Sequence, residues 1–381
     1  MIKVVTLSLL IFWNSLPDAF AQTDVALGEE FVIQSSILAE DRHYIVHLPA
    51  SYKGDDLYVN KRYPVLVVLD SDTHFLPICG LTHALSVNDE IIPEMIIVGV
   101  RNTDRSRDMT PMTNKRTQEN PFSKFLESEL LKEVDRRYRT LPFRILAGHS
   151  LAGLFALDCF LNKNVFNAYL AIDPSVRSGD EYIIKKADSV FKQDPNTRSI
   201  LYTAESKNPF NTNAIDERHA AFERFRMAID QASPRGVNHK HEYLVDEDHF
   251  SIPSIAFYRG LLHVFEGFKI PLHSPALKST RDVVNYCRLY QERMGAEIAV
   301  PGKQINQVAA FYLSESKAER AIELYKVNQT FFPDSFLVYQ NLAEAFRSKG
   351  DMEVAAKYYK AALKLSPDNQ KLKDDLRKIT P

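Results

Sequence analysis

Residues 145–153 (ILAGHSLAG) place one serine among small residues, in a pattern that could support covalent catalysis. A buried strand is expected to end at Ala147 and a helix to begin at Leu151, which leaves Ser150 in a sharp turn between them. This order is typical of a nucleophile elbow, and an ordinary structural turn is the alternative. The elbow predicts Ser150 as the nucleophile of acyl transfer and the backbone N–H of Leu151 as a donor to an oxyanion.

A serine hydroxyl needs a base, and in sheets of this type the chain order is serine, acid, histidine. Of the eleven histidines, His249 follows the last predicted strand, Glu242–Val245, in an acidic loop that ends at a proline. His249 is therefore the predicted base, and a surface histidine in an acidic loop is the alternative.

The acid is expected just past the predicted strand Ile200–Thr203. Glu205 is the first carboxylate there and is the predicted acid, with Asp216 and Glu217 in reserve. A serine–histidine dyad that uses no carboxylate stays open.

A second oxyanion donor is expected after the predicted strand Tyr63–Leu69. The backbone N–H of Ser71 or Asp72 is the candidate, and an ordinary turn is the alternative. Further along, Arg105 and Arg107 could bind an anionic or catecholate substrate, because guanidinium is a planar fork of donors. In the alternative, the arginines pair with neighbouring aspartates and hold down a loop.

Metal and cofactor sites are not expected. The sequence contains no H-E-x-x-H, and Asp70 with Asp72 is too little for a calcium loop. Cys79, Cys159 and Cys287 lack C-x-x-C spacing, which argues against a zinc site or a disulfide framework. Whether two of the cysteines pair is left open.

The elements that must position these residues alternate between strand and helix up to about residue 270. Short apolar runs such as Tyr63–Leu69, Met95–Val100 and Ala168–Ile172 read as buried strands, and the segment Pro121–Tyr138 has a helical pattern. This alternation predicts an α/β fold with a mostly parallel sheet covered by helices. The 47 basic and 49 acidic residues give a net charge of −2, which argues against a nucleic-acid binder.

Residues 1–21 have the pattern of a cleaved signal peptide. Lys3 precedes an apolar run, Val4–Trp13, that is too short to span a bilayer, and Ala19-Phe20-Ala21 provides small residues at a cleavage site. We therefore expect a periplasmic or secreted protein with no membrane span.

The remaining part, residues 271–381, is expected to be helical and contains an internal repeat. Positions with the same residue character recur 34 residues apart, which is the period of tetratricopeptide repeats. The matching pairs are Val308/Leu342, Ala309/Ala343, Tyr312/Phe346, Ala321/Ala355, Tyr325/Tyr359 and Pro333/Pro367. Two repeats, at about 302–335 and 336–369, are predicted, with the helical segments Asp282–Gly295 and Gln370–Ile379 as caps.

Residues 22–270 resemble the putative-esterase family of α/β-hydrolases, which includes enterobactin and salmochelin esterases. The resemblance covers about Phe31 to Phe268 and is carried by ordered motifs: Glu40-Asp41-Arg42, Leu48-Pro49, Tyr63-Pro64-Val65-Leu66, Leu69-Asp70, Arg105 to Pro111, Tyr138-Arg139 and Gly148 to Phe155. Two residues depart from the family pattern. Ala152 replaces the second glycine of the elbow, and Ser71 stands where relatives often have glycine.

The resemblance implies hydrolysis of carboxylic esters, with Ser150 as nucleophile and His249 as base and a small-molecule ester as substrate. A siderophore ester would fit the expected periplasmic location. Two alternative functions are compatible with the same sequence. An acyltransferase would share every catalytic residue and exclude water, whereas a noncatalytic protein would bind a protein partner through the tetratricopeptide repeats.

Overall fold

The computed structural model describes residues 27–87, 90–111, 120–163, 165–193, 199–207, 212–232, 236–274 and 276–380. The predicted signal peptide, residues 1–21, lies outside them. None of the helices in these ranges has the length and apolar character needed to cross a membrane.

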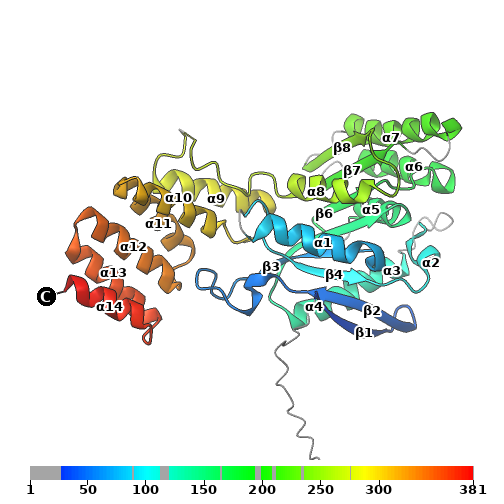
Figure 1. Ribbon diagram of the computed structural model, residues 1–381. Helices are drawn as coiled ribbons and strands as arrows, with labels where there is room; N and C mark the ends of the chain where they lie inside the picture. Colours follow the sequence, from blue (N-terminus) through cyan, green and yellow to red (C-terminus); the bar gives the residue numbers. More distant parts are fainter. Residues whose placement is uncertain are drawn as a thin grey trace, which may run out of the picture.

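An eight-stranded sheet forms the centre of the first part of the chain (Figure 1). Its strand order is β1-β2-β4-β3-β5-β6-β7-β8, in which β2 is antiparallel to β1 and β4 and the other neighbours are parallel. The strands are β1 (Glu29–Ser35), β2 (Glu40–His47), β3 (Tyr63–Val68), β4 (Ile96–Val100), β5 (Thr140–His149), β6 (Ala168–Ile172), β7 (Ser199–Ser206) and β8 (Val237–Leu244). Every residue of β3, β4 and β6 is buried, as expected for central parallel strands covered on both faces.

Helices cover both faces of this sheet, which confirms the predicted α/β-hydrolase architecture. The helices and helical turns are η1 (Ala50–Lys53), α1 (Ser71–Ser86), α2 (Arg105–Met109), α3 (Pro121–Phe125), the π-helical turn η2 (Leu126–Leu130), α4 (Leu131–Arg137), α5 (Leu151–Leu161), α6 (Ser178–Gln193), α7 (Thr212–Ala232) and α8 (Ile252–Val264). One apolar core joins the sheet to α1 and α8, and a second joins the opposite face to α3 through α7. The strands are thus held rigidly from both sides.

The described residues after α8 form the helices α9 (Thr280–Met294), α10 (Gly302–Ser314), α11 (Ala318–Phe331), α12 (Phe336–Lys349), α13 (Met352–Leu365) and α14 (Gln370–Ile379). Helices α12 and α13 begin 34 residues after α10 and α11, the period expected of tetratricopeptide repeats. The repeated alanines Ala309, Ala321, Ala343 and Ala355 have no exposed surface, since small residues are needed where paired helices approach closely.

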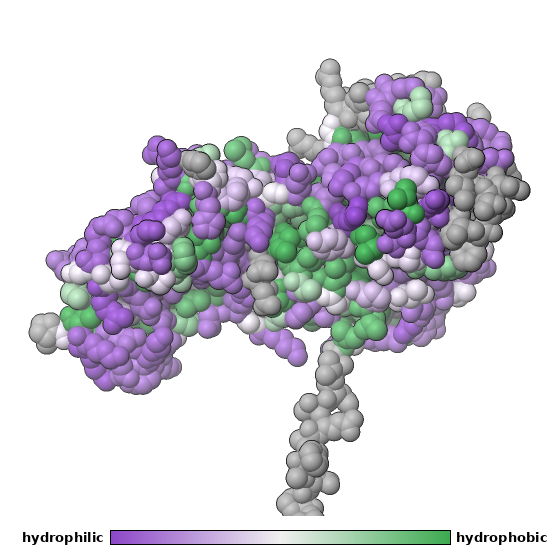
Figure 2. Space-filling model, turned by 45° about the horizontal axis from the view of Figure 1, so that its top comes forward, coloured by the Kyte–Doolittle hydropathy of each residue, from purple (hydrophilic) through white to green (hydrophobic). Residues whose placement is uncertain are grey.

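The helical region joins the sheet at the end where β3 and β4 begin (Figure 1). Tyr58, in the connection before β3, donates a hydrogen bond to Glu90, in the connection before β4. The same hydroxyl accepts a 2.8 Å bond from the backbone N–H of Gly302, and Glu90 accepts a 2.8 Å bond from that of Gln304. Figure 2 shows apolar side chains gathered in the middle of the molecule, between its two parts.

Candidate active site

Ser150 sits at a strained turn between β5 and α5. Its backbone angles are φ 60° and ψ −117°, a conformation that costs free energy and that a nucleophile elbow requires. Its N–H donates a 2.9 Å hydrogen bond to the carbonyl of Ile172, and its carbonyl accepts one of 3.0 Å from Leu154. These bonds hold the turn between the neighbouring strand β6 and the helix that follows.

Close backbone approach explains the small residues on either side of Ser150. A Cβ on Gly148 would lie 2.3 Å from the carbonyl oxygen of Ala152, nearer than any real Cβ contact. A Cβ on Gly153 would lie 3.0 Å from the carbonyl of Ile172. Ala152 itself is fully buried, so the turn accommodates this departure from the elbow pattern.

His249 lies in the turn between β8 and α8, where its ring reaches the serine. Its Nε2 atom is 3.1 Å from Ser150 Oγ, within hydrogen-bond range. Asp248 does not touch the ring, because its carboxylate accepts the backbone N–H groups of Phe250 and Ser251 at 2.7 and 2.9 Å. The structure therefore brings together the predicted nucleophile and base, 99 residues apart in the chain.

The carboxylate that orients His249 is Asp173. His249 Nδ1 lies 2.6 Å from Asp173 Oδ2, and Asp173 also accepts bonds from the Ser206 N–H at 2.9 Å, from the Ser206 hydroxyl at 2.8 Å and from Arg218. Burial alone would raise the pKa of Asp173, but these donors and the charge of Arg218 hold it below its usual value. Asp173 is thus an ionised, buried partner for His249.

Glu205 does not contact His249, so its prediction as the acid is wrong. The Glu205 carboxylate is buried and lies 3.0 Å from Nδ1 of His219 on α7, and burial raises its pKa. The reason is strand order: β6 lies directly beside β5, whereas β7, which carries Glu205, is one strand farther away. The available signal was the predicted strand Ala168–Ile172, which Asp173 follows immediately.

The predicted oxyanion donors lie at the starts of two helices that follow the adjacent strands β3 and β5. Leu151 is the first residue of α5, and Ser71 and Asp72 are the first two of α1, so their N–H groups have no partner within the helix. Strands β3 and β5 pair in parallel with Val68 opposite Ala147, which carries Ser71 toward Ser150. Ser71 is buried there, whereas the Asp72 side chain is half exposed and pairs with Arg101.

Arg105 and Arg107 are held by carboxylates. Arg105 makes two hydrogen bonds to Asp70, at 2.7 and 2.8 Å, and Arg107 bonds to Glu40 and Asp108. Burial would raise the pKa of Asp70, but the bonds from Arg105 and Asn102 keep it below its usual value. These contacts fit the alternative in which both arginines tie down the loop, and substrate binding by either one stays a prediction.

Comparison with known families finds two matches. Residues 35–208 match the profile of the putative esterase family. Residues 337–369 match a tetratricopeptide repeat, in agreement with the second predicted repeat. No curated protein matches the sequence.

Solved structures share the fold of the esterase part of the chain and of residues beyond it. An IroE-like serine hydrolase from Shewanella oneidensis is 25% identical, with a TM-score of 0.69, and the alignment covers 80% of this chain and 99% of that one. An uncharacterised protein from Capnocytophaga ochracea is 17% identical over 88% of this chain and 93% of that one, with a TM-score of 0.62. A siderophore hydrolase, EstA from Aspergillus nidulans, is 16% identical over 64% and 97%, with a TM-score of 0.50. The last two show the fold alone.

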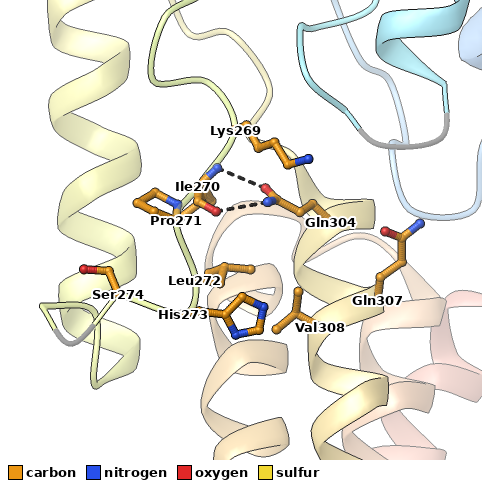
Figure 3. Close-up of a pocket in the computed structure, with 9 residues that line it drawn as sticks. All are labelled: Lys269, Ile270, Pro271, Leu272, His273, Ser274, Gln304, Gln307 and Val308. Carbon is orange, nitrogen blue, oxygen red and sulfur yellow. Dashed lines mark hydrogen bonds between the residues drawn. The ribbon is translucent and has the colours of Figure 1, made fainter.

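A cavity of about 750 Å³ lies apart from the esterase triad (Figure 3). It is lined by the connector 269–274 and by Gln304, Gln307 and Val308 of α10. The Gln304 side chain bonds both the N–H and the carbonyl of Ile270, each at 3.0 Å. None of the triad residues lines this cavity, so it is not the site of ester cleavage.

Proposed function

We propose that the protein is an exported serine esterase that cleaves carboxylic esters through an acyl-enzyme, with siderophore-like catecholate esters as the substrate class. The observation that carries the proposal is the triad: Ser150 Oγ at 3.1 Å from His249, and His249 at 2.6 Å from the buried Asp173. The serine hydrolase fold of the 25% identical relative supports it. The proposed export rests on the sequence pattern of residues 1–21.

The triad supports a two-step acyl transfer. His249 Nε2 takes the hydroxyl proton as Ser150 Oγ attacks the ester carbonyl, and Asp173 stabilises the imidazolium that forms. The N–H groups of Leu151 and of Ser71 or Asp72 stabilise the oxyanion. His249 then gives its proton to the departing alcohol, and a water molecule, deprotonated by the same ring, releases the acid and regenerates Ser150.

Two observations support the proposed substrate class. Phe250, beside His249, leaves 73% of its surface exposed, and its ring centre lies 5.5 Å from that of His249. An exposed aromatic ring next to the base suits a substrate that carries aryl groups, because aromatic rings stack or pack edge to face. The structural neighbour EstA from Aspergillus nidulans is a siderophore hydrolase, and we extend that chemistry to this chain as part of the proposal.

Hydrolysis assays on the mature protein test the proposal. A p-nitrophenyl ester and an iron-free or ferric triscatecholate trilactone should be cleaved, and Ser150→Ala or His249→Ala should lower kcat by at least about 10³-fold. Asp173→Asn should lower it by about 10²- to 10⁴-fold, whereas the matched variant Glu205→Gln should stay within about threefold of wild type. Full activity in Ser150→Ala would end the assignment, and a larger loss in Glu205→Gln than in Asp173→Asn would restore Glu205 as the acid.

A further inference from the structure

Two imidazole rings lie side by side at the site, with 4.5 Å between the ring centres of His249 and His149. His249 contacts the nucleophile, whereas His149 ends β5 and takes no part in the proposed acyl-transfer steps. His149 is 9% exposed, and within the described part of the chain its Nε2 atom has no hydrogen-bond partner. Leaving a buried polar atom unsatisfied costs free energy, so a ligand that satisfies this nitrogen would be favoured.

The free nitrogen of His149 carries a lone pair. The His149 ring packs against the rings of His249 and His74, whose centres lie 4.5 and 5.4 Å from its own. Nε2, the atom without a partner among the described residues, is the nitrogen open to a ligand.

His249 has the same arrangement. Its Nδ1 bonds to Asp173 at 2.6 Å, so Nε2 is the nitrogen open to Ser150 or to a metal ion. A histidine whose second nitrogen donates to a carboxylate is the usual form of a zinc ligand, since the carboxylate fixes the ring and increases its basicity. The His249 side chain is 24% exposed, which gives an ion from solvent a way in.

His149, Asp173 and His249 each offer a ligand atom, and the three atoms lie within 4.8 Å of one another. Zinc binds imidazole nitrogen at about 2.0–2.1 Å, so two nitrogens on one tetrahedral ion are about 3.4 Å apart. The 4.8 Å limit exceeds this spacing by about 1.4 Å, so the two rings must move closer together to share one ion.

We infer that this site binds one Zn²⁺ ion through Nε2 of His149 and of His249, with Asp173 orienting His249, and that the ion inhibits the esterase. The bound ion occupies the lone pair that would accept the Ser150 proton, so metal binding and ester turnover exclude each other. Water or the Ser150 oxygen completes the coordination. Metal binding stands independently of the proposed function, whereas inhibition rests on it.

Calorimetry with Zn²⁺ tests binding without any assay of activity. The mature wild-type protein should bind one Zn²⁺ per chain at neutral pH and should not bind Mg²⁺, which prefers oxygen ligands. His249→Ala, in an exposed turn, should abolish the signal, and His149→Gln should weaken binding at least tenfold. His219→Gln is the matched control, because His219 also pairs with a buried carboxylate, Glu205, and it should bind as wild type does.

Inhibition is then measured with a p-nitrophenyl ester at buffered free Zn²⁺, each variant against its own zinc-free rate. Wild type and His219→Gln should be inhibited at the calorimetric affinity and recover with a chelator, and His149→Gln should need at least tenfold more zinc. No binding in calorimetry, or unchanged binding in both His249→Ala and His149→Gln, would overturn the inference. If the protein binds zinc as expected but hydrolyses no ester, the metal site stands and the proposed function fails.

Discussion

Four donor groups converge on the carboxylate of Asp173, from His249, Arg218 and both the backbone and the hydroxyl of Ser206. Asp173 itself has a positive φ of 46°, in the first position after β6. Its backbone N–H donates a 2.8 Å bond to the carbonyl of Ala204 on β7. The residue is therefore fixed by two strands as well as by its side-chain partners, and it can orient His249 without having to reorganise during the reaction.

The lowered pKa of Asp173 predicts a pH dependence of stability. The folded protein binds this proton less readily than the unfolded chain, so the carboxylate stabilises the fold above its ordinary pKa of 3.8. That contribution is lost as the pH falls below 3.8. In urea unfolding, Asp173→Asn should be about 2 kcal/mol less stable than wild type at pH 7, and the gap should narrow at pH 3. A gap that is constant with pH would contradict this account.

Among the catalytic residues, the sequence predicted Ser150 and His249, but it did not identify the acid. The elbow is a local pattern, and His249 follows the last strand, so both can be found from order along the chain. The acid depends on which strand end lies nearest the histidine, and that is a property of the assembled sheet. Asp173 follows β6 and Glu205 lies near the end of β7, both of them buried strands, and the position of β6 beside β5 distinguishes the two carboxylates.

Among the elements, the connection between β2 and β3 has a role that its sequence did not indicate. Leu57 and Tyr58 are buried in the core of the helical region, far along the chain from their neighbours there. Lys303 adds an ion pair with Asp55 at 2.8 Å. Burial raises the pKa of Glu90, which accepts the hydrogen bond of Tyr58. This connection therefore links the sheet to the helices through polar as well as apolar contacts.

Removing one hydroxyl tests that link. Tyr58→Phe removes one hydrogen-bond partner from the buried Glu90 and one from the N–H of Gly302, so it should destabilise the protein by about 1–3 kcal/mol. Tyr359→Phe is the control, since the buried Tyr359 hydroxyl has no partner among the residues that the structure describes, and its removal should be neutral or slightly stabilising. Thermal or urea unfolding of both variants provides the comparison. Equal changes in the free energy of unfolding for the two variants would show that the link contributes no stability.

Many elements were predictable because their patterns are local. Strand β6 and helix α14 have the predicted bounds, Ala168–Ile172 and Gln370–Ile379, and the 34-residue displacement appears in the starts of four helices. Strand β5 runs two residues beyond its expected end at Ala147, because Gly148 and His149 pair with β6. Such pairing depends on the neighbouring strands, so it cannot be predicted from the residues of one segment.

For the whole molecule, the position of the helical region decides what it can do. It contacts the connections before β3 and β4, whereas Ser150, Asp173 and His249 follow the opposite ends of their strands. Six residues of β3 span roughly 20 Å, so the helices do not close over the triad. The likeness to the Shewanella oneidensis hydrolase covers 80% of the 381 residues, more than the 270 that precede the helical region, so it extends into those helices.

Two truncations separate support of the fold from catalysis. Tyr290, Met294 and Ile298 pack in the same core as α1 and α8, so a chain that ends after Leu272 should lose several kcal/mol of stability. A chain that ends after Ile298 keeps these residues and should be less affected. Unfolding temperature and KM for a p-nitrophenyl ester are measured for both chains. KM should match wild type in whichever chain stays folded, and a changed KM in the longer chain would show that the repeats act on the site.

Covalent trapping of the nucleophile tests the central claim most directly. A fluorophosphonate reacts with a serine only when a base activates its hydroxyl, and mass spectrometry locates the adduct. One adduct per chain is expected, on Ser150, with none in Ser150→Ala and little in His249→Ala, while Glu205→Gln reacts as wild type does. An unreactive wild-type protein, or an adduct on a different serine, would contradict the account.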